Sequence, residues 1–214
     1  LAEQYNKNGN VNYLYKWRTI GDEVVYFGLI TEYSEIFEHL SVAYNTVKAY
    51  NLKSDKLQIK ATSWLAGFPV NNAIIYSKKF KKVEKNEQKD LVSYEDINFI
   101  GPSIDTGFRI SKYSKKEKFV ISLELALVLL DLFSKDESKS KMFELYFDNV
   151  QDTKGVSDGK YPIIWINTDF EDKKTDFILE KKDACCFKLL LTYCKQYFTD
   201  KSIAIPFIYG VQHE

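Results

Sequence analysis

The chain has few of the residues on which several common chemistries depend. It holds two histidines, His39 and His213, and three cysteines among its 214 residues. Two histidines leave little material for a histidine-based catalytic triad or a histidine metal cluster. Cys185 and Cys186 are adjacent and no Cys-x-x-Cys spacing occurs, which argues against a disulfide framework and a zinc knuckle. This cysteine usage fits a reducing cytosol.

An excess of charge of one sign is also absent. Lys plus Arg and Asp plus Glu both number 30, so the composition gives no electrostatic reason to expect nucleic acid or an anionic membrane as a partner. A membrane helix needs roughly 20 apolar residues, and even the apolar segment 119–133 is interrupted by Glu124 and Asp131. We therefore expect a cytoplasmic protein with one well-buried domain, or one domain with an appendage.

Residues 16–27 predict a β-hairpin. Apolar and polar residues alternate before Ile20, an apolar run follows Glu23, and Gly21 and Asp22 form the tight turn between them. An aspartate at such a tip has a carboxylate on a rigid base, which suits a hard divalent cation. An ordinary turn aspartate is the alternative, because Gly and Asp are common turn residues.

The rest of the chain predicts helices and strands in alternation. Helical spacing of apolar residues is found at 29–50, 104–114, 123–133 and 181–198. Strands are predicted at 57–68, 73–76, 97–101, 119–122, 143–147 and 161–166. The segment 57–68 has the pattern of a central strand. Ser122 is a typical helix cap, and the lysine-rich run 78–90 is typical of an exposed loop. This order predicts an α+β sandwich with a mixed sheet flanked by helices.

Carboxylates, arginines and lysines remain as the candidate chemical groups. That inventory suits phosphoryl transfer, where positioning and charge neutralisation do most of the catalytic work. Residues 155–160 have one spacer too few for a Walker phosphate loop. Asp105 and Arg109, four positions apart, lie on one face of the predicted helix after Gly101. In one interpretation they form an ion pair on a solvated face. In the other, Arg109 binds a phosphate beside a helix amino terminus.

Three motifs, in the right order along the chain, carry a resemblance to a known enzyme family. They are Arg18-Thr-Ile-Gly-Asp22, the segment Ile100-Gly-Pro-Ser-Ile-Asp-Thr-Gly-Phe-Arg109 with the strand 119–122, and Lys154-Gly155. These resemble the Lys-x-x-Gly-Asp hairpin, the transition-state helix with its following strand, and the triphosphate-binding Lys-Gly of the class III nucleotidyl cyclases. The resemblance covers about residues 11–166.

The resemblance implies a ferredoxin-like sandwich that acts as a head-to-tail homodimer. Residues 1–166 would form the catalytic domain, and 167–214 a C-terminal extension with an amphipathic helix. Asp22 would bind two Mg²⁺ or Mn²⁺ ions together with a second aspartate expected before Leu1. Asp22 would come from one protomer and the other site residues from its partner, so monomers would be inactive.

The resemblance also implies a role for each remaining site residue. Arg109 would stabilise charge on the transferring phosphate, and Lys154 would hold the β/γ end of the triphosphate. Asp105 stands where the family has an asparagine that touches ribose and phosphate. Arg18 and Asn98 stand at the two base-reading positions.

Arg18 and Asn98 both differ from the purine pattern and look most like the uridylate-type pyrimidine cyclases of the bacterial Pycsar antiphage system. Arg18 offers only donors, which suit O4 of uracil, while the Asn98 carbonyl suits N3–H. We expect conversion of UTP, then CTP, to the 3′,5′-cyclic monophosphate and pyrophosphate, with a separate cyclic-nucleotide-responsive effector downstream. A purine cyclase remains an alternative, as does an inactive cyclase-like module that binds a nucleotide or dimerises.

Overall fold

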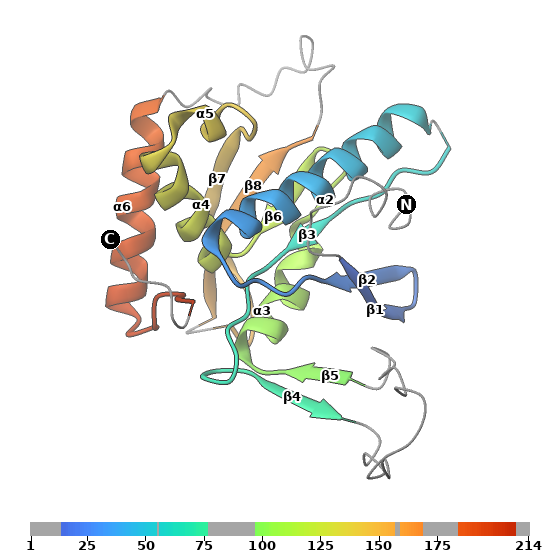
Figure 1. Cartoon of the computed structure of the whole chain (residues 1–214), viewed down its shortest axis with the longest axis horizontal. Helices are drawn as coiled ribbons and strands as arrows, with labels where there is room; N and C mark the ends of the chain where they lie inside the picture. Colours follow the sequence, from blue (N-terminus) through green and yellow to red (C-terminus); the bar gives the residue numbers. More distant parts are fainter. Residues whose placement is uncertain (1–13, 55, 77–96, 157–158, 169–183, 209–214) are drawn as a thin grey trace, which may run out of the picture.

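The largest sheet in the described part of the chain has four strands in the order β3-β6-β8-β7 (Figure 1). The computed structural model describes residues 14–54, 56–76, 97–156, 159–168 and 184–208. The strands are β3 (Thr62–Ser63), β6 (Lys118–Ile121), β7 (Leu145–Asp152) and β8 (Lys160–Asn167). Because β3 is parallel to β6 whereas β6 and β7 are antiparallel to β8, the predicted mixed sheet is confirmed.

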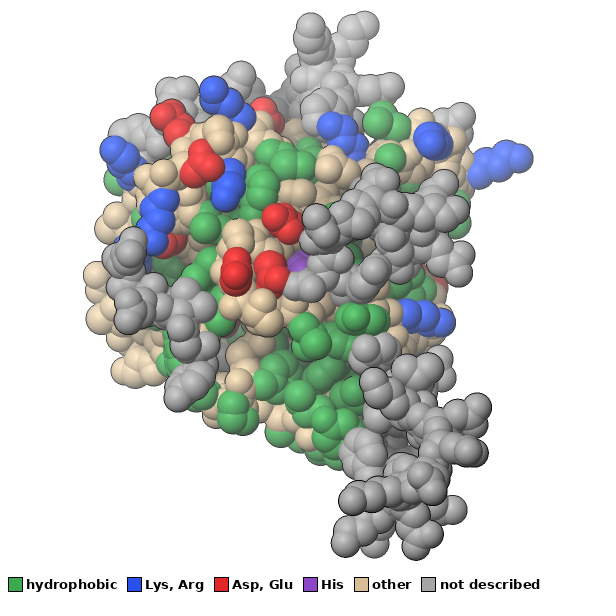
Figure 2. Space-filling view, in the orientation of Figure 1, with side chains coloured by type: hydrophobic (Ala, Val, Ile, Leu, Met, Phe, Trp, Pro, Cys, Tyr) green, Lys and Arg blue, Asp and Glu red, His purple; other side chains and the backbone are tan. Residues whose placement is uncertain are grey.

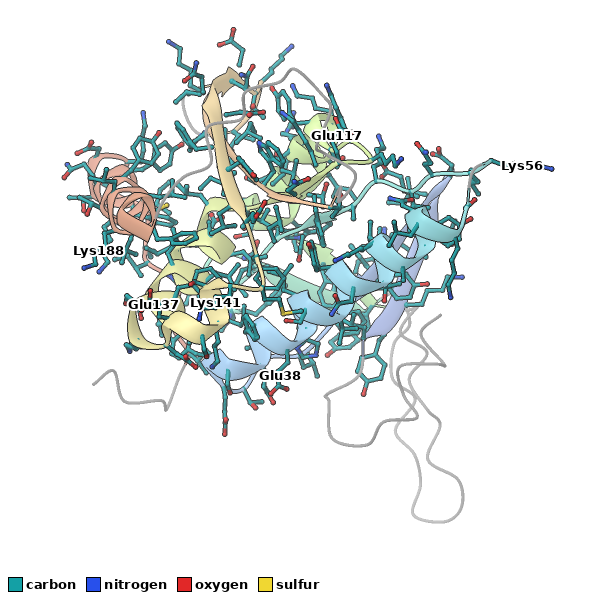
Figure 3. All side chains as sticks on the ribbon, turned by 90° about the horizontal axis from the view of Figure 1, so that it is seen from above. Glu38, Lys56, Glu117, Glu137, Lys141 and Lys188 are labelled. Atoms are coloured by element: carbon teal, nitrogen blue, oxygen red, sulfur yellow. The ribbon has the colours of Figure 1, made fainter. Side chains whose placement is uncertain are left out.

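Three longer helices share one hydrophobic core with this sheet: α2 (Tyr33–Lys53), α4 (Leu123–Lys135) and α6 (Ala184–Asp200). The sequence of α4 is apolar on nearly every side, and the helix is accordingly buried between α2, α6 and β8. A short helix, α5 (Glu137–Ser140), follows it. Figure 3 shows the labelled charged side chains, from Glu38 to Lys188, at the periphery of these layers.

Two hairpins lie beside the main sheet. One joins β1 (Tyr15–Ile20) to β2 (Glu23–Phe27), and the other pairs β4 (Ala73–Tyr76) with β5 (Ile97–Ile100). The helix α3 (Pro102–Ile110) follows β5 and continues into a 3-10 turn, η3 (Ser111–Tyr113). A second, smaller core holds the hairpins and α3 together: its buried or partly buried members are Trp17, Val25, Phe27, Trp64, Ala66, Phe99, Ile104 and Phe108.

The hairpins expose apolar side chains. Figure 2 shows hydrophobic atoms gathered on the lower part of the visible face, the region in which Figure 1 draws β4 and β5. Large apolar residues at least 42% exposed on the four hairpin strands are Ile20, Val24, Tyr26, Ile74, Ile75, Tyr76 and Ile100. Contiguous apolar surface of this kind commonly marks an interaction site.

Most predicted elements are confirmed, with ends displaced by a few residues. The helix predicted at 29–50 runs from Tyr33 to Lys53, and the strand predicted at 143–147 runs from Leu145 to Asp152. Ser122 caps α4 by accepting a hydrogen bond from the Leu125 amide. The predicted loop 78–90 lies outside the described residues, and the division near residue 166 stays a prediction. No helix in the described ranges is long and apolar enough to cross a membrane.

The prediction of a central strand at 57–68 is wrong. Only Thr62–Ser63 pairs, and it lies at the sheet edge. The Asn51 side chain accounts for part of the difference, because its amide donates to the Ile59 carbonyl at 2.8 Å and accepts from the Ile59 N–H at 2.8 Å. A side chain that binds both backbone groups of a residue replaces a neighbouring strand there.

Candidate active site

The hairpin turn presents Asp22 to solvent. Ile20 pairs with Glu23, so Gly21 and Asp22 form the two-residue turn, and Gly21 adopts the left-handed conformation that such turns require (φ +61°). Asp22 is exposed and has no hydrogen-bond or ion-pair partner among the described residues. Its carboxylate oxygens suit Mg²⁺ or Mn²⁺, but the described part of the chain contains no group of three or more His, Cys, Asp or Glu side chains placed to hold a metal.

The structure brings Arg18 and Asn98 together. The Arg18 Nη2 donates a hydrogen bond to the Asn98 side-chain oxygen across 80 sequence positions. Both side chains are half-buried, and they come from adjacent edges of β1 and β5. The Arg18 Nε–H is buried and finds no acceptor among the described residues. The two positions that resemble a base-reading pair are therefore in direct contact.

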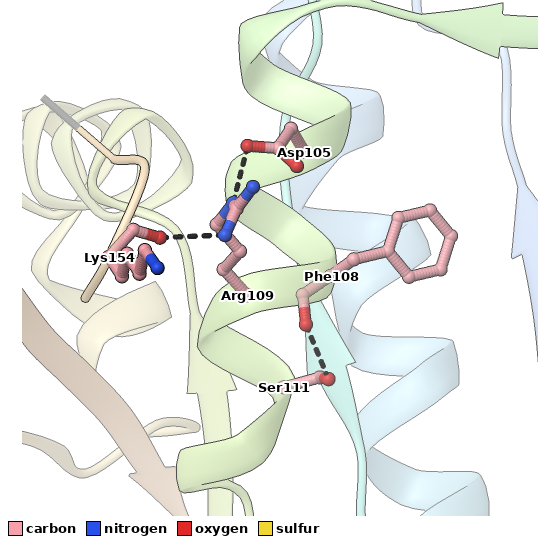
Figure 4. Close-up of polar contacts among 5 residues, drawn as sticks. All are labelled: Asp105, Phe108, Arg109, Ser111 and Lys154. Atoms are coloured by element: carbon pink, nitrogen blue, oxygen red, sulfur yellow. Dashed lines mark hydrogen bonds and ion pairs between the residues drawn. The ribbon is translucent and has the colours of Figure 1, made fainter.

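Arg109 reaches from α3 to the loop between β7 and β8 (Figure 4). Its Nε donates to the Asp105 carboxylate at 2.5 Å, and its Nη1 donates to the backbone carbonyl of Lys154 at 2.7 Å. The hydrogen bond that Arg109 donates to Asp105 raises the pKa of the Arg109 guanidinium, although both side chains stay 40–49% exposed. The structure has the ion pair, the first of the two alternatives that the spacing leaves open, and the role of Arg109 at a phosphate stays a prediction. The loop contact adds a second anchor for the guanidinium.

Gly155 provides the surface on which this guanidinium rests. A Cβ at Gly155 would lie 2.7 Å from the Arg109 Cζ, closer than real Cβ atoms approach other atoms. The loop is closed by a hydrogen bond of 2.7 Å from the Thr153 amide to the Gly159 carbonyl. Lys154 is exposed beside Arg109, so two cationic side chains lie at one place where α3 meets the loop.

Asn72 supports this arrangement and was not predicted. It is 3% exposed, accepts a hydrogen bond from the Ser103 amide at 3.2 Å and donates to the Gly67 carbonyl at 2.8 Å. It thereby satisfies an amide in the first turn of α3, which has no cap from its own Gly101. The sequence around Asn72 gives no signal for this role, because the contact with Ser103 spans 31 positions.

A broad, open pocket of about 1960 Å³ lies beside the hairpins and α3. Trp17, Asp22 and Phe108 line it, whereas Arg18, Asn98, Asp105, Arg109 and Lys154 do not. Arg109 and Lys154 are accessible to solvent outside this pocket, whereas Arg18 is half-buried.

Comparisons with protein-family models, with curated proteins and with solved structures found no match for this chain.

Proposed function

We propose that this chain is a class III-type nucleotidyl cyclase that converts a pyrimidine nucleoside triphosphate, with UTP preferred over CTP, to its 3′,5′-cyclic monophosphate and pyrophosphate. The observation that carries the proposal is the paired arrangement of the motif residues. Arg18 contacts Asn98, and Arg109 contacts the Lys154-Gly155 backbone, although each pair is separated by 45 or more positions. Independent turn, strand and loop residues would have no reason to meet in these two pairs.

The two pairs suit the two ends of a nucleotide. At one end, the Arg18 guanidinium and the Asn98 amide offer donors and an acceptor to a base. At the other, Arg109 and Lys154 offer fixed positive charge to phosphates, and Asp105 holds the Arg109 Nε so that the guanidinium is oriented in advance. Preorganised charge of this kind stabilises a transition state because no reorganisation is needed during the reaction.

A divalent metal fits the exposed carboxylate of Asp22. Bound Mg²⁺ or Mn²⁺ would supply activation of the 3′-hydroxyl and neutralisation of the phosphates. Asp22 is the one ligand that we assign in the described part of the chain, so further ligands belong to the proposal as well. The exposed apolar residues of the hairpins fit a homodimer in which a second protomer covers the basic surface. The cyclic product would act on a separate effector in antiphage defence.

A second candidate function is a nucleotide-binding module without turnover. It is favoured by the lack of a group of three metal-ligating side chains within the described ranges. The Arg18–Asn98 and Arg109–Lys154 contacts would serve this function equally well, because binding needs no catalytic metal.

Turnover of the four ribonucleoside triphosphates with Mn²⁺ tests both candidates. We expect the full chain to favour UTP over CTP by roughly tenfold to hundredfold, because the cytosine amine would face Arg18 donor to donor. Arg18→Ala should reduce that preference while leaving the dependence on Mn²⁺ concentration unchanged. Asp22→Asn should abolish turnover with the fold intact, since an amide still suits the turn. Equal use of UTP and CTP would contradict the proposed UTP preference, and a preference for ATP would move the answer to a purine cyclase. Binding without turnover would support the module.

A further inference from the structure

We infer that Trp17 is the positioning residue that holds Arg18 and Asn98 in register and thereby sets base selectivity. This inference rests on the proposed function. Trp17 is 3% exposed and sits between the two hairpins. Its ring contacts Arg18, and its indole N–H binds the residue before Asn98.

A β-bulge places Trp17 beside Arg18. Lys16 pairs with Tyr26 and Arg18 pairs with Val25, so Trp17 is the extra residue of β1. In a regular strand neighbouring side chains point to opposite faces, whereas a bulge re-aims one of them. Here the Arg18 guanidinium carbon lies 3.9 Å from the centroid of the Trp17 ring. The indole face therefore supports the guanidinium, whose buried Nε–H has no acceptor among the described residues.

The indole N–H fixes the strand that carries Asn98. The Trp17 Nε1 donates to the Ile97 carbonyl at 2.6 Å, one residue before Asn98. On the other side of Asn98, the Phe99 ring centroid lies 4.9 Å from that of Trp17. Both neighbours of Asn98 are thus held by the same side chain that supports Arg18. The spacing between the Arg18 donors and the Asn98 amide depends on Trp17 rather than on either residue alone.

Trp17 also connects this pair to α3. Its ring centroid lies 6.4 Å from that of Phe108, the residue before Arg109. The aromatic contacts of Trp17 therefore extend from β1 to α3, the helix that carries Arg109. A change at Trp17 should alter the choice of base first, because its direct contacts are to Arg18 and to the neighbours of Asn98.

Two substitutions distinguish the contribution of the Trp17 ring from that of its indole N–H. Trp17→Phe keeps an aromatic face and loses the donor to Ile97, so the ratio of kcat/KM for UTP to that for CTP should fall about three- to tenfold. Trp17→Leu removes both, and the ratio should fall about ten- to hundredfold. Trp165→Phe is the matched control: Trp165 is fully buried in the main sheet and donates to Asp148 at 3.0 Å. The Trp165→Phe variant should lose about as much stability as Trp17→Phe, while its ratio of kcat/KM for UTP to that for CTP stays unchanged.

An NMR measurement on Arg18 tests whether Trp17 positions this side chain, and it does not depend on turnover. In the full chain, the NMR resonance of the Arg18 Nε–H should be shifted upfield by the indole ring current and exchange slowly with water. Trp17→Leu should remove both properties, and Trp165→Phe neither. An unshifted, rapidly exchanging Nε–H in the parent chain would overturn the positioning. A full UTP preference in a folded Trp17→Phe variant would overturn the role in selectivity.

The proposed function is tested by a different result from the one that tests Trp17. If the protein, tested with any segment that precedes Leu1, neither binds UTP in the presence of Ca²⁺ nor turns over any ribonucleoside triphosphate, the cyclase proposal is rejected, and the assignment of Trp17 to base choice is rejected with it. The Arg18 resonance would then still show whether Trp17 holds the Arg18–Asn98 contact.

Discussion

At the scale of single residues, the candidate site depends on contacts that fix cationic side chains. Arg109 is held at its Nε by Asp105 and at its Nη1 by the Lys154 carbonyl. A guanidinium with two anchors cannot move far, so its remaining N–H donors point to a defined region. This geometry is of more use to a short-lived transition state than to a flexible substrate.

Arg109→Ala should therefore lower kcat more than it changes KM. We expect a loss of about 100-fold or more in kcat, with KM for UTP altered less than about threefold, because the charge on the phosphates grows as the reaction proceeds. Steady-state kinetics with UTP and Mn²⁺ measures both values. If KM rose while kcat stayed constant, Arg109 would be a binding residue only.

Two glycines in one loop give a controlled test of the Arg109 anchor. Gly155 and Gly159 both adopt positive φ, +82° and +88°, so alanine should destabilise the fold by about 1–2 kcal/mol at either position. A Cβ at Gly155 would meet the Arg109 guanidinium, whereas nothing lies within 4 Å of a Cβ at Gly159. Urea unfolding and turnover should be measured on both variants. We expect similar stability losses, with turnover reduced in Gly155→Ala alone; equal turnover in the two would remove the guanidinium from the mechanism.

At the scale of secondary structure, the sequence predicts those elements whose signals are local. The turn at Gly21 and Asp22 and the start of α4 at Ser122 are confirmed because each depends on residues within a few positions. The strand at 57–68 is wrong because Asn51, outside that segment, binds both backbone groups of Ile59. A tertiary hydrogen bond of this kind leaves no periodic trace in the sequence.

In the candidate site, too, the sequence predicts the local contacts and misses the long-range ones. The Asp105–Arg109 ion pair follows from a spacing of four on a helix, and the structure has it. The contacts of Arg18 with Asn98 and of Trp17 with Ile97 join strands 80 positions apart, and only the packing of the two hairpins makes them. The resemblance named Arg18 and Asn98, whereas the bulge at Trp17 and the supporting Asn72 came from the structure.

Substitution of Ser122 tests how the start of α4 is stabilised. Its hydroxyl accepts hydrogen bonds from the Leu125 and Leu65 amides, each at 3.3 Å, so it links the start of α4 to the segment after β3. Ser122→Ala should lower the free energy of unfolding by about 1–2 kcal/mol, because two buried amides lose their acceptor. Ser134→Ala is the control, since the exposed Ser134 hydroxyl bonds only within α4, and its change should stay within about 0.5 kcal/mol. Equal midpoints in urea would contradict the capping role.

At the scale of the whole molecule, the site residues differ in exposure: Lys154 is exposed and the Arg109 side chain is 40% exposed, whereas Arg18 and Asn98 are half-buried. Arg18, Asn98, Arg109 and Lys154 do not line the pocket beside the hairpins, and apolar side chains of those hairpins are exposed. Both features are explained if two copies of the chain pack together and each basic surface meets the Asp22 turn of the other copy. A two-fold pair of this kind creates two equivalent sites.

Mixing two inactive variants tests this shared site. If Asp22 from one protomer serves the Arg109 of its partner, a mixed dimer of Asp22→Asn and Arg109→Ala chains contains one site with both residues intact. After subunit exchange in an equimolar mixture, half of the dimers are mixed, so about a quarter of the parent activity should return. The control mixes the double variant Asp22→Asn/Arg109→Ala with Arg109→Ala, because no site of that mixed dimer has an intact Arg109. No restoration in the test mixture, at concentrations where sedimentation shows mixed dimers, would place Asp22 and Arg109 of one site in the same chain.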